Sequence, residues 1–579
     1  MLETDTHKSI TYQELKIKVE NLMCILIEFG VHKGDKVGIY LPKGSNQIVA
    51  VLAILGIGAC YVPIGVNQAL QRMRGMLLKA NIKTIISDEN GKKYLQENVQ
   101  QNIVLVNAKN AVKSSCDTMP DSTERSAYII FTSGTTGEPK GVEISHRSAW
   151  NTINEVNKIC CVDEHSKILS VSALEFDLSV YDIFGILSEG GTVVVTSENA
   201  RRDAAVWANA IMDYNITVWN SVPYLLNMLL TVAETEGKVF PSLKKVILSG
   251  DWIGLDLPER LKRIAPNAEM LAMGGATEAA IWSNFIQVQL PLPSKWVSIP
   301  YGKPLAGQLY RVVDQAGKDC PNWVSGELWI GGDGVAKGYI SDDLLTEEKF
   351  VYENGIRWYK TGDMGRFWPD GTIEFLGRKD TQVKIRGHRI EMGEIESILN
   401  QYPGIISSVV DVVGIKESKK IYAYIISRQK KLDFKSIEQF LKSYLPEYMI
   451  PSKFVMGEKI PLSLNGKVER SYVSRILEEN LNVESVDYEE PIGTTETTIS
   501  LIWKKVLKIE KLSRNDDFFE VGGDSLKAVS IMSQLKQKNL VPINTSVQIL
   551  FTNSTIKKFA EQVNRLNMEE NQETEIDTI

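Results

Sequence analysis

The first 300 residues alternate between two kinds of hydrophobic pattern. Residues 15–29 place apolar side chains at helical spacing, and residues 36–41 form a short strand that leads into a second helical run over 47–58. Similar β-branched strands follow between amphipathic stretches at residues 127–131, 192–196 and 245–249. Such alternation is typical of layered α/β domains with largely parallel sheets.

The pattern changes after about residue 300. Residues 301–377 contain strand-like segments between Gly, Pro and Asp turns, which predict an antiparallel or barrel-like region. A mixture of helices and strands then predicts a small α+β unit, and helical runs without a convincing strand predict a small bundle. We expect these boundaries: a large unit over 1–379, the small unit over 380–477, an acidic linker over 478–491, the bundle over 492–567 and a frayed polar tail over 568–579.

Composition narrows the function classes. With 579 residues, 43% hydrophobic and 24% charged, the chain is globular with several domains. A net charge of −7 provides no broad field for nucleic acid or an anionic membrane, so neither is an expected partner. Six cysteines without zinc or disulfide spacing, and no signal peptide or long apolar run, predict a soluble cytoplasmic protein.

A loop of small residues over 131–141 is the strongest local signal of chemistry. Its glycines let backbone N–H groups approach an anion, its hydroxyls add donors, and Lys140 supplies a mobile charge, a combination suited to a polyphosphate. Pro139 precedes the lysine, and residues 142–145 look like a strand rather than a helix. The loop is therefore no Walker motif.

Several motifs in order resemble the acyl-adenylating superfamily, and specifically the adenylation domain of non-ribosomal peptide synthetases. They are Ser133–Gly141, Tyr359–Asp363, Gly377–Asp380, Gln382–Gly387 and Asn465–Lys467. Downstream, Asp517–Leu526 looks like the attachment site of a peptidyl carrier domain. The resemblance implies an α/β adenylation core with layered sheets and a barrel-like region, a small α+β C-terminal subdomain, and an all-α four-helix carrier bundle.

The resemblance also implies roles for individual residues. It assigns ATP binding to Thr132, Ser133, Gly134, Thr135, Thr136, Lys140, Gly275, Asp363 and Arg378. Asp363 would hold the ribose, Thr277 would donate to the α-phosphate, and Glu278 would bind magnesium, a hard cation that prefers carboxylate oxygen. Arg378 is either a ribose or phosphate contact or a structural ion-pair partner. Gly274 stands where the family's adenine-stacking aromatic usually sits, and Ala276 replaces a proline, so the sequence leaves the stacking group open.

Two further implied roles concern movement. Lys467 would bridge the substrate carboxylate and the α-phosphate, where negative charge accumulates. Asp380, beside Lys379, would be the hinge that withdraws Lys467, after which the surface around 384–388 would face the site.

Ser525 has no adjacent histidine base, so the sequence does not support a hydrolase nucleophile there; Ser525 would carry 4′-phosphopantetheine at an exposed helix start.

Asp177 matches the family's partner for a substrate ammonium group, which selects an α-amino acid. The other predicted lining residues are Leu178, Tyr181, Asn220, Ile247, Ser249, Met273, Ile281 and Trp282. This bulky, weakly polar set resembles the family pattern for L-cysteine, with L-serine as the nearest alternative.

The resemblance thus implies an amino-acid-activating enzyme that uses ATP, Mg²⁺ and 4′-phosphopantetheine. Expected partners are a phosphopantetheinyl transferase, an upstream condensation or cyclisation module and downstream modules. An acyl- or aryl-coenzyme A ligase and a non-catalytic carrier or docking module are the alternatives. Asp177 and Ser525 argue against the first, and the joint presence of Lys140, Glu278, Asp363 and Lys467 argues against the second.

Overall fold

The computed structural model covers the whole chain. It describes every residue except 108–121, 135–138, 295, 297, 380–381, 386, 415–418, 430–431, 458–469, 480–487, 508, 520, 524, 543–544 and 577–579. Thr135, Thr136, Asp380 and Lys467 therefore lie outside the described residues, and only the backbone of Ser525 is described. We call residues 1–379 the core, 382–479 the small unit and 488–576 the helical unit.

Two large sheets dominate the core. In the first, the strand order is β1-β9-β8-β10-β11-β12-β13-β14, parallel up to β12 and antiparallel beyond it. Its strands are β1 Leu2–Glu3, β8 Lys167–Ser170, β9 Thr192–Val195, β10 Val218–Ser221, β11 Lys245–Leu248, β12 Glu269–Gly274, β13 Asn284–Val288 and β14 Lys303–Pro304.

The second sheet has the order β17-β7-β6-β3-β2-β4-β5. Its strands are β2 Lys36–Tyr40, β3 Cys60–Pro63, β4 Thr84–Ser87, β5 Asn102–Leu105, β6 Ser126–Thr132, β7 Lys140–Ser145 and β17 Gly338–Tyr339. The predicted strand after the glycine-rich loop is confirmed, because β7 pairs antiparallel with β6. The loop is thus the tip of a hairpin and does not open a helix.

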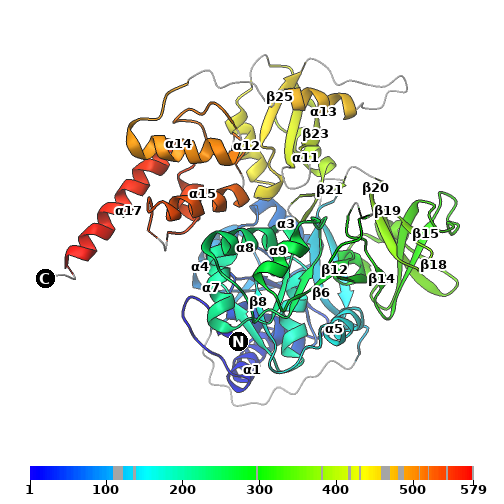
Figure 1. Ribbon diagram of the computed structural model, residues 1–579. Coiled ribbons are helices and arrows are strands. Elements are labelled where there is room, and N and C mark those ends of the chain that lie inside the picture. The colour runs from blue at the N-terminus through cyan, green and yellow to red at the C-terminus, as the bar shows by residue number, and fades with distance from the viewer. Residues whose placement is uncertain are drawn as a thin grey trace.

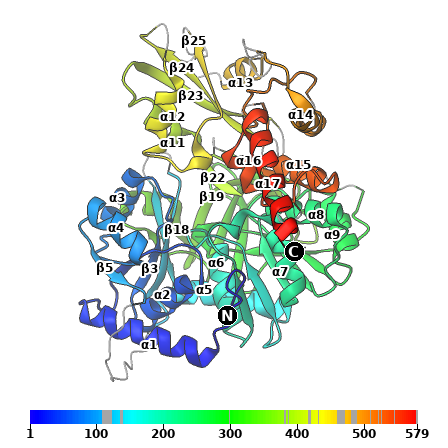
Figure 2. The same ribbon diagram turned by 90° about the vertical axis from the view of Figure 1, so that its left-hand side faces the viewer.

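Helices cover these sheets in two groups (Figure 2), with α1–α4 around β3 and β5 and α7–α9 on the other side. The helices of the core are α1 Tyr12–Glu28, α2 Ser45–Gly56, α3 Leu70–Lys79, α4 Glu89–Asn98, α5 His146–Cys160, α6 Leu178–Val180, α7 Ala204–Tyr214, α8 Pro223–Glu236, α9 Leu257–Ile264 and α10 Asp343–Lys349. Short π or 3₁₀ turns are η1 Tyr181–Gly185, η2 Ala200–Arg202 and η3 Thr277–Ala279. Local signals fix several ends: Thr11 and Glu14 form a capping box at α1, and α8 begins at Pro223.

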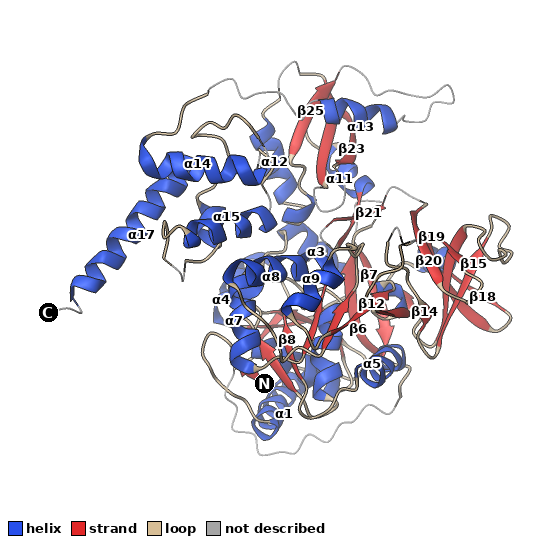
Figure 3. Ribbon diagram, viewed as in Figure 1, coloured by secondary structure: helices blue, strands red, loops and turns tan. Residues whose placement is uncertain are grey.

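The predicted barrel-like region is a five-stranded antiparallel sheet at the side of the core (Figure 3). Its strands are β15 Gln308–Val313, β16 Gly326–Gly332, β18 Phe350–Glu353, β19 Ile356–Phe367 and β20 Ile373–Arg378. β19 and β20 carry Asp363 and Arg378 as directly paired residues.

The small unit has its own hydrophobic cluster, which includes Ile390, Ile395 and Ile425. Its elements are β21 Gln382–Ile385, β22 His388–Glu391, α11 Met392–Leu399, β23 Ile405–Val413, β24 Lys420–Ser427, α12 Phe434–Lys442, η5 Glu447–Met449, β25 Lys453–Gly457 and α13 Arg470–Glu479. The hairpin of β21 and β22 extends toward the core (Figure 1). α13 includes Glu478 and Glu479, so the helix extends two residues into the predicted linker.

The helical unit contains α14 Gly493–Leu507, α15 Ser525–Gln537, α16 Gln548–Thr552 and α17 Ile556–Ile576. The predicted fold class is therefore confirmed. α17 continues to Ile576, so helix is assigned over much of the predicted frayed tail, and the fraying itself stays a prediction. Glu and Gln, which are frequent there, are good helix formers, and exposed polar residues can extend a helix that is already nucleated. No helix within the described residues is long and apolar enough to cross a membrane.

Candidate active site

The pairing of β10, β11 and β12 places four of the predicted substrate-lining residues on the same side of the first sheet. Asn220 on β10 pairs with Ile247 on β11, and Ile247 pairs with Leu271 on β12. Side chains two residues apart on a strand point to the same face. Asn220, Ile247, Ser249 and Met273 therefore lie on one face of the first sheet.

The segment from α6 to η1 covers this face. The amide nitrogen of Asn220 donates to the Leu178 carbonyl at 3.2 Å, and the Tyr181 ring packs edge-on against Trp282 with centroids 5.1 Å apart. The Trp282 indole N–H donates to the Ser249 hydroxyl at 2.8 Å. The structure thus brings these predicted lining residues together in one buried layer.

Ile281 joins this layer through an unusual backbone. Ala280 and Ile281 have φ values of 54° and 75°, in the left-handed region. A β-branched residue rarely adopts this region, and such strain concentrates at functional sites. The strained turn directs the chain from η3 to Trp282.

Asp177 lies directly before α6 and is almost fully buried, with 6% of its surface exposed. Its carboxylate accepts a hydrogen bond from the Thr277 hydroxyl at 2.8 Å. Burial raises its pKa to about 6, although the Thr277 hydrogen bond acts in the opposite direction. Asp177 is therefore a poorly solvated anion held by a neutral donor. Thr277, expected at the α-phosphate, contacts Asp177 in this arrangement.

Glu278 is fully buried, and its carboxylate is bound by Arg389 of β22. One guanidinium nitrogen lies 3.0 and 2.9 Å from the two carboxylate oxygens, and the Tyr339 hydroxyl donates at 2.8 Å. Burial alone would raise the pKa of Glu278, but the Arg389 charge and hydrogen bonds hold it below its ordinary value. The predicted magnesium ligand is therefore neutralised by a residue that the sequence did not suggest.

The glycine-rich hairpin also contacts the small unit. The Ser133 hydroxyl donates to the Arg389 carbonyl at 2.7 Å, and the Gly134 N–H donates to Glu394 at 3.1 Å. Lys140 lies 3.8 Å from Glu391. The predicted phosphate loop and the small unit are thus in direct contact.

Thr132 closes the base of the same hairpin. Its hydroxyl donates to the Lys140 carbonyl at 3.5 Å, beside the β6–β7 pairing. Burial lowers the pKa of Lys140, against the opposing charge of Glu391. An anionic ligand in this place would give Lys140 a second counter-charge.

The predicted ribose site lies beside an aromatic cavity. Arg378 donates to Asp363 at 2.6 Å, so the structural pairing that the sequence left open is present. A cavity of about 240 Å³ next to this pair is lined by Trp252, Tyr301 and Phe375. Tyr301 and Phe375 stack with centroids 5.0 Å apart, and Trp252 lies 5.3 Å from Phe375. These rings supply the aromatic surface that Gly274 lacks.

Gly274 and Gly275 both allow close approach at the edge of this cavity. A Cβ on Gly274 would meet the Asn284 side chain at 2.8 Å, and one on Gly275 would lie 2.7 Å from the Ile281 carbonyl oxygen. An added side chain at Gly275 would collide with backbone, which cannot move cheaply. Gly275 is thus required for the turn that presents Thr277 and Glu278.

A second cavity, of about 410 Å³, joins all three units. Its wall includes Ser133 and Thr277 of the core, His388 and Tyr448 of the small unit, and Gln548 of the helical unit. The rings of His388 and Tyr448 stack with centroids 3.9 Å apart. The cavity therefore reaches from the helical unit to the residues around Asp177.

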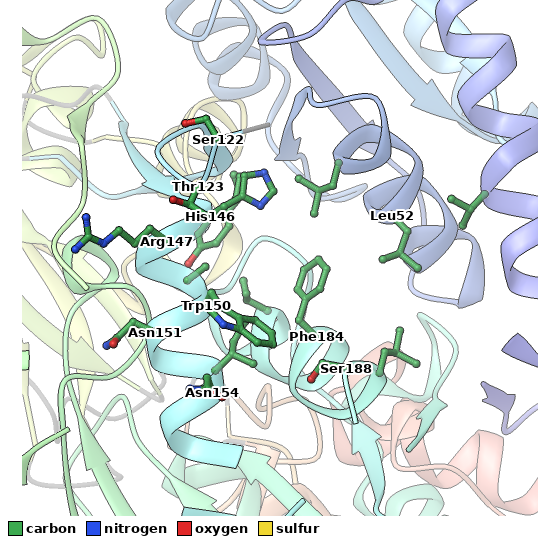
Figure 4. A pocket seen from close by; sticks show the side chains of 18 of the residues that line it. Leu52, Ser122, Thr123, His146, Arg147, Trp150, Asn151, Asn154, Phe184 and Ser188 are labelled. Atoms are coloured by element: carbon green, nitrogen blue, oxygen red, sulfur yellow. The ribbon is translucent and has the colours of Figure 1, made fainter. Parts of the chain in front are cut away.

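A further cavity of about 950 Å³ lies elsewhere in the core (Figure 4). Leu52, Trp150 and Phe184 give it an apolar wall, with His146 and Arg147 at one end. The residues lining it include none of the predicted site residues. It is separate from the candidate active site.

The donor set fits a magnesium ion that is bound mainly through a nucleotide. Within the described residues there is no group of three or more His, Cys, Asp or Glu side chains suited to a metal ion. Magnesium usually takes one or two carboxylates and completes its shell with phosphate oxygens and water. Glu278 can supply such a carboxylate once Arg389 has moved away.

Sequence reasoning missed several residues of this site. Arg389 immediately follows the segment expected to face the site, and Trp252 and Tyr301 lie outside the recognised motifs. The one signal for Arg389 is that a buried carboxylate such as Glu278 needs a positively charged partner. Lys379 contacts Gly362 and Glu327 in the core.

Comparisons with known proteins agree with this architecture. The AMP-binding enzyme family matches residues 2–340, and the phosphopantetheine attachment site family matches residues 497–563. The Anguibactin system regulator of Vibrio anguillarum is 42% identical over 98% of this chain and 55% of its own length. Pyochelin synthetase PchE of Pseudomonas aeruginosa is 45% identical over 70% of this chain and 28% of its own. The chain thus spans about half or less of these relatives.

Among solved structures, holo-PA1221, described as an NRPS protein containing adenylation and PCP domains, has a TM-score of 0.80 at 24% identity, with 98% of this chain and 94% of that one covered. A four-domain non-ribosomal peptide synthetase, holo-AB3403, has a TM-score of 0.59 at 29% identity, with 97% of this chain and 41% of that one covered. This chain belongs to the AMP-binding enzyme family. It is an AMP-forming ligase of the adenylation–carrier type found in non-ribosomal peptide synthetases, with ATP, Mg²⁺ and 4′-phosphopantetheine as cofactors.

Proposed function

We propose that the chain activates a small α-amino acid as its aminoacyl-AMP and loads it as a thioester on the phosphopantetheine of Ser525. L-Cysteine is the proposed substrate, and L-serine is the nearest alternative. The single observation that carries this proposal is the buried Asp177 carboxylate beside a layer of bulky, weakly polar side chains.

Asp177 supports an amino acid over other carboxylic acids. Its carboxylate accepts a hydrogen bond from the neutral Thr277 hydroxyl, and a substrate ammonium group would supply a positive charge in direct contact with it. A substrate without an amine would leave a buried charge uncompensated.

The predicted lining supports a small side chain. The Tyr181 and Trp282 rings pack against each other and restrict the volume. Asn220 and Ser249 add polarity, and the predicted lining offers no second charge for an acidic or basic side chain. These features suit the thiol of cysteine or the hydroxyl of serine.

At the nucleotide end, Asp363 and Arg378 would hold the ribose, and Trp252, Tyr301 and Phe375 offer aromatic surface for the adenine. Glu278 would hold magnesium, which neutralises phosphate charge when it is bound. Thr132, Ser133, Gly134, Lys140 and Gly275 would surround the phosphates. Lys467 as the catalytic lysine, Asp380 as the hinge, and Thr135 and Thr136 in the phosphate loop stay predictions.

The observed contact between Arg389 and Glu278 supports two arrangements of the small unit. In the first, used for adenylation, magnesium would bind Glu278, and in the second, used for carrier loading, Arg389 binds it. Arg389 lies against both carboxylate oxygens of Glu278 and would compete with magnesium for them, so the observed arrangement suits the stage after pyrophosphate has left. The 410 Å³ cavity then offers a route by which a carrier thiol would approach the activated carboxyl group.

The expected partners follow from this proposal. A phosphopantetheinyl transferase would modify Ser525, which begins α15. Condensation, cyclisation and downstream modules would use the loaded amino acid, in keeping with the greater length of the relatives. The need for ATP favours the cytoplasm. The alternative of a coenzyme A ligase predicts product release on free coenzyme A, without labelling of the carrier.

Intact-protein mass spectrometry tests the proposal. The holo chain with ATP, Mg²⁺ and L-cysteine should gain the mass of one cysteinyl group, and Ser525→Ala should gain neither phosphopantetheine nor cysteine. A cysteinyl adduct that persists on Ser525→Ala, or release of cysteinyl-coenzyme A with an unlabelled carrier, would contradict it.

A further inference from the structure

Asn220 of the predicted substrate layer forms a buried polar pair with Asp182, a residue to which no role has been assigned above. Asp182 belongs to η1, and both Asp182 and Asn220 are fully buried. The Asn220 amide nitrogen donates to the Asp182 carboxylate at 2.8 Å and to the Leu178 carbonyl at 3.2 Å. One amide nitrogen thus serves two acceptors.

These two partners fix the orientation of the Asn220 amide. A carboxylate oxygen and a backbone carbonyl oxygen both accept hydrogen bonds. Turning the amide over would place its own oxygen against two acceptor oxygens and lose both bonds. The amide nitrogen therefore faces Asp182, and the amide oxygen faces the other way.

The Asn220 amide oxygen has no hydrogen-bond partner among the described residues, although it is buried. Buried carbonyl groups are normally paired, and leaving one unpaired is costly. Asn220 shares its sheet face with Ile247 and Ser249. The Ser249 hydroxyl already accepts from Trp282. The unpaired oxygen thus lies in the layer that would receive the substrate side chain.

Asp182 is itself held in place. The buried Lys43 ammonium group donates to the Ser172 carbonyl at 2.6 Å and to the Ser170 hydroxyl at 3.3 Å. Its charge acts on Asp182. Asp182 therefore sits in a supported polar network behind Asn220, where it can orient the amide without touching the substrate.

We propose that Asp182 is a positioning residue that turns Asn220 so that the pocket presents a hydrogen-bond acceptor, which selects amino acids whose short side chain carries a donor. This inference rests on the proposed function and deepens it. A thiol or hydroxyl would pair with the Asn220 oxygen, whereas a methyl group of the same shape would leave that oxygen unpaired.

The first test compares L-cysteine with L-2-aminobutyrate, which has a methyl group in place of the thiol. In amino-acid-dependent pyrophosphate exchange by the wild-type chain, kcat/KM for L-cysteine should exceed that for L-2-aminobutyrate at least tenfold. Exchange with amino acids but equal values for these two would overturn the Asp182 proposal and leave the proposed function standing. Absence of exchange with every amino acid would overturn both.

The second test uses variants. Asp182→Asn offers its own amide hydrogens to Asn220, which lets the Asn220 oxygen turn toward residue 182. The preference for cysteine should then fall to within about threefold of unity, while exchange with L-2-aminobutyrate continues. Asn220→Leu should remove or invert the preference and carries the test where Asp182→Asn does not fold. The exposed Asp213→Asn, which removes the same charge at the surface, should keep the wild-type ratio. A wild-type ratio in folded Asp182→Asn, or in Asn220→Leu, would overturn the proposal.

Discussion

At the scale of single residues, the site depends on carboxylates that are costly to bury. Burial raises the cost of a charge on both Asp177 and Glu278, but their pKa values shift in opposite directions. Glu278 is paired with Arg389, whereas Asp177 accepts from the neutral Thr277 hydroxyl. Burial therefore raises the pKa of Asp177, and the Arg389 charge keeps that of Glu278 low. The residue with the unmet charge is the one expected to bind a cationic group.

The raised pKa of Asp177 predicts a pH dependence of amino-acid capture. Only the ionised carboxylate attracts an ammonium group, and with a pKa of about 6 the ionised fraction falls as the pH drops through that value. kcat/KM for the amino acid should be about tenfold lower at pH 5 than at pH 7, because this ratio reports the free enzyme. Pyrophosphate exchange measured across this range checks the prediction.

Asp177→Asn provides the control for that profile. It should lower kcat/KM at pH 7 by at least a hundredfold and remove the step near pH 6. A variant that keeps the step would show that another group controls amino-acid capture.

Some of these residues could be predicted from the sequence and others could not. Asp177, Thr277, Glu278 and Asp363 sit in short motifs, so local sequence was enough to nominate them. Arg389 lies 111 positions from Glu278, and their contact depends on how the small unit meets the core. Long-range ion pairs of this kind leave no periodic signal along the chain.

At the scale of elements, the hairpin of β21 and β22 connects the small unit to Glu278 and Asp251 of the core. Gly387 at its turn has φ of 83°, and its N–H donates to Asp251 at 3.2 Å. A Cβ there would lie 2.4 Å from Val222. The hairpin can therefore approach the core only with glycine at this turn.

Removing the Arg389 charge should separate the two half-reactions. In Arg389→Met the buried Glu278 loses its counter-charge in the observed arrangement, which is strongly destabilising for a buried pair. Carrier loading should slow at least tenfold, whereas amino-acid-dependent pyrophosphate exchange should stay within about threefold of wild type. Rapid-quench loading and exchange assays on the same preparation measure both.

Arg263→Met is the matched control for this experiment, since it removes an exposed arginine that pairs with Glu234 at the surface. It should change neither half-reaction. Equal losses of exchange and loading in Arg389→Met would contradict a role of Arg389 that is confined to carrier loading.

The elements themselves were predicted with mixed success. The β6–β7 hairpin followed from β-branched runs on both sides of a glycine-rich loop, where short-range pattern and structure agree. The helical runs up to residue 567 were predicted, but the continuation of α17 to Ile576 was not, because the polarity of the last residues was taken as a sign of fraying. Helical propensity without an apolar face is a weak signal for a helix end.

At the scale of the whole molecule, the helical unit docks on the core through α15 and α8. The Gln537 side chain donates to the Thr235 carbonyl at 3.1 Å, and the Ser546 hydroxyl donates to Asp203 at 2.8 Å. One hydrophobic cluster includes residues from both units. Docking of this kind was beyond sequence reasoning, because nothing local specifies which faces of two domains meet.

Charge reversal at this interface should slow loading alone. Lys536 on α15 faces the charges of Glu236 and Asp203, so Lys536→Glu places like charges together. Loading should fall about tenfold with unchanged pyrophosphate exchange, and the double variant Lys536→Glu with Glu236→Lys should recover most of the rate. Single-turnover loading at low and high salt measures the effect, which salt should weaken.

Lys538→Glu serves as the control, since it reverses an exposed charge in the turn directly after α15. It should load at the wild-type rate. If Lys536→Glu also loads normally, the observed docking is not the one used for transfer.

We propose that the buried carboxylate of Asp177 restricts this enzyme to amino acids. The most direct measurement is pyrophosphate exchange with the twenty amino acids and with matched acids that lack the amine, 3-mercaptopropionate above all. We expect L-cysteine or L-serine to give the highest kcat/KM, and 3-mercaptopropionate to be at least a hundredfold poorer than L-cysteine. An amine-free acid that turns over as well as or better than every amino acid would contradict it.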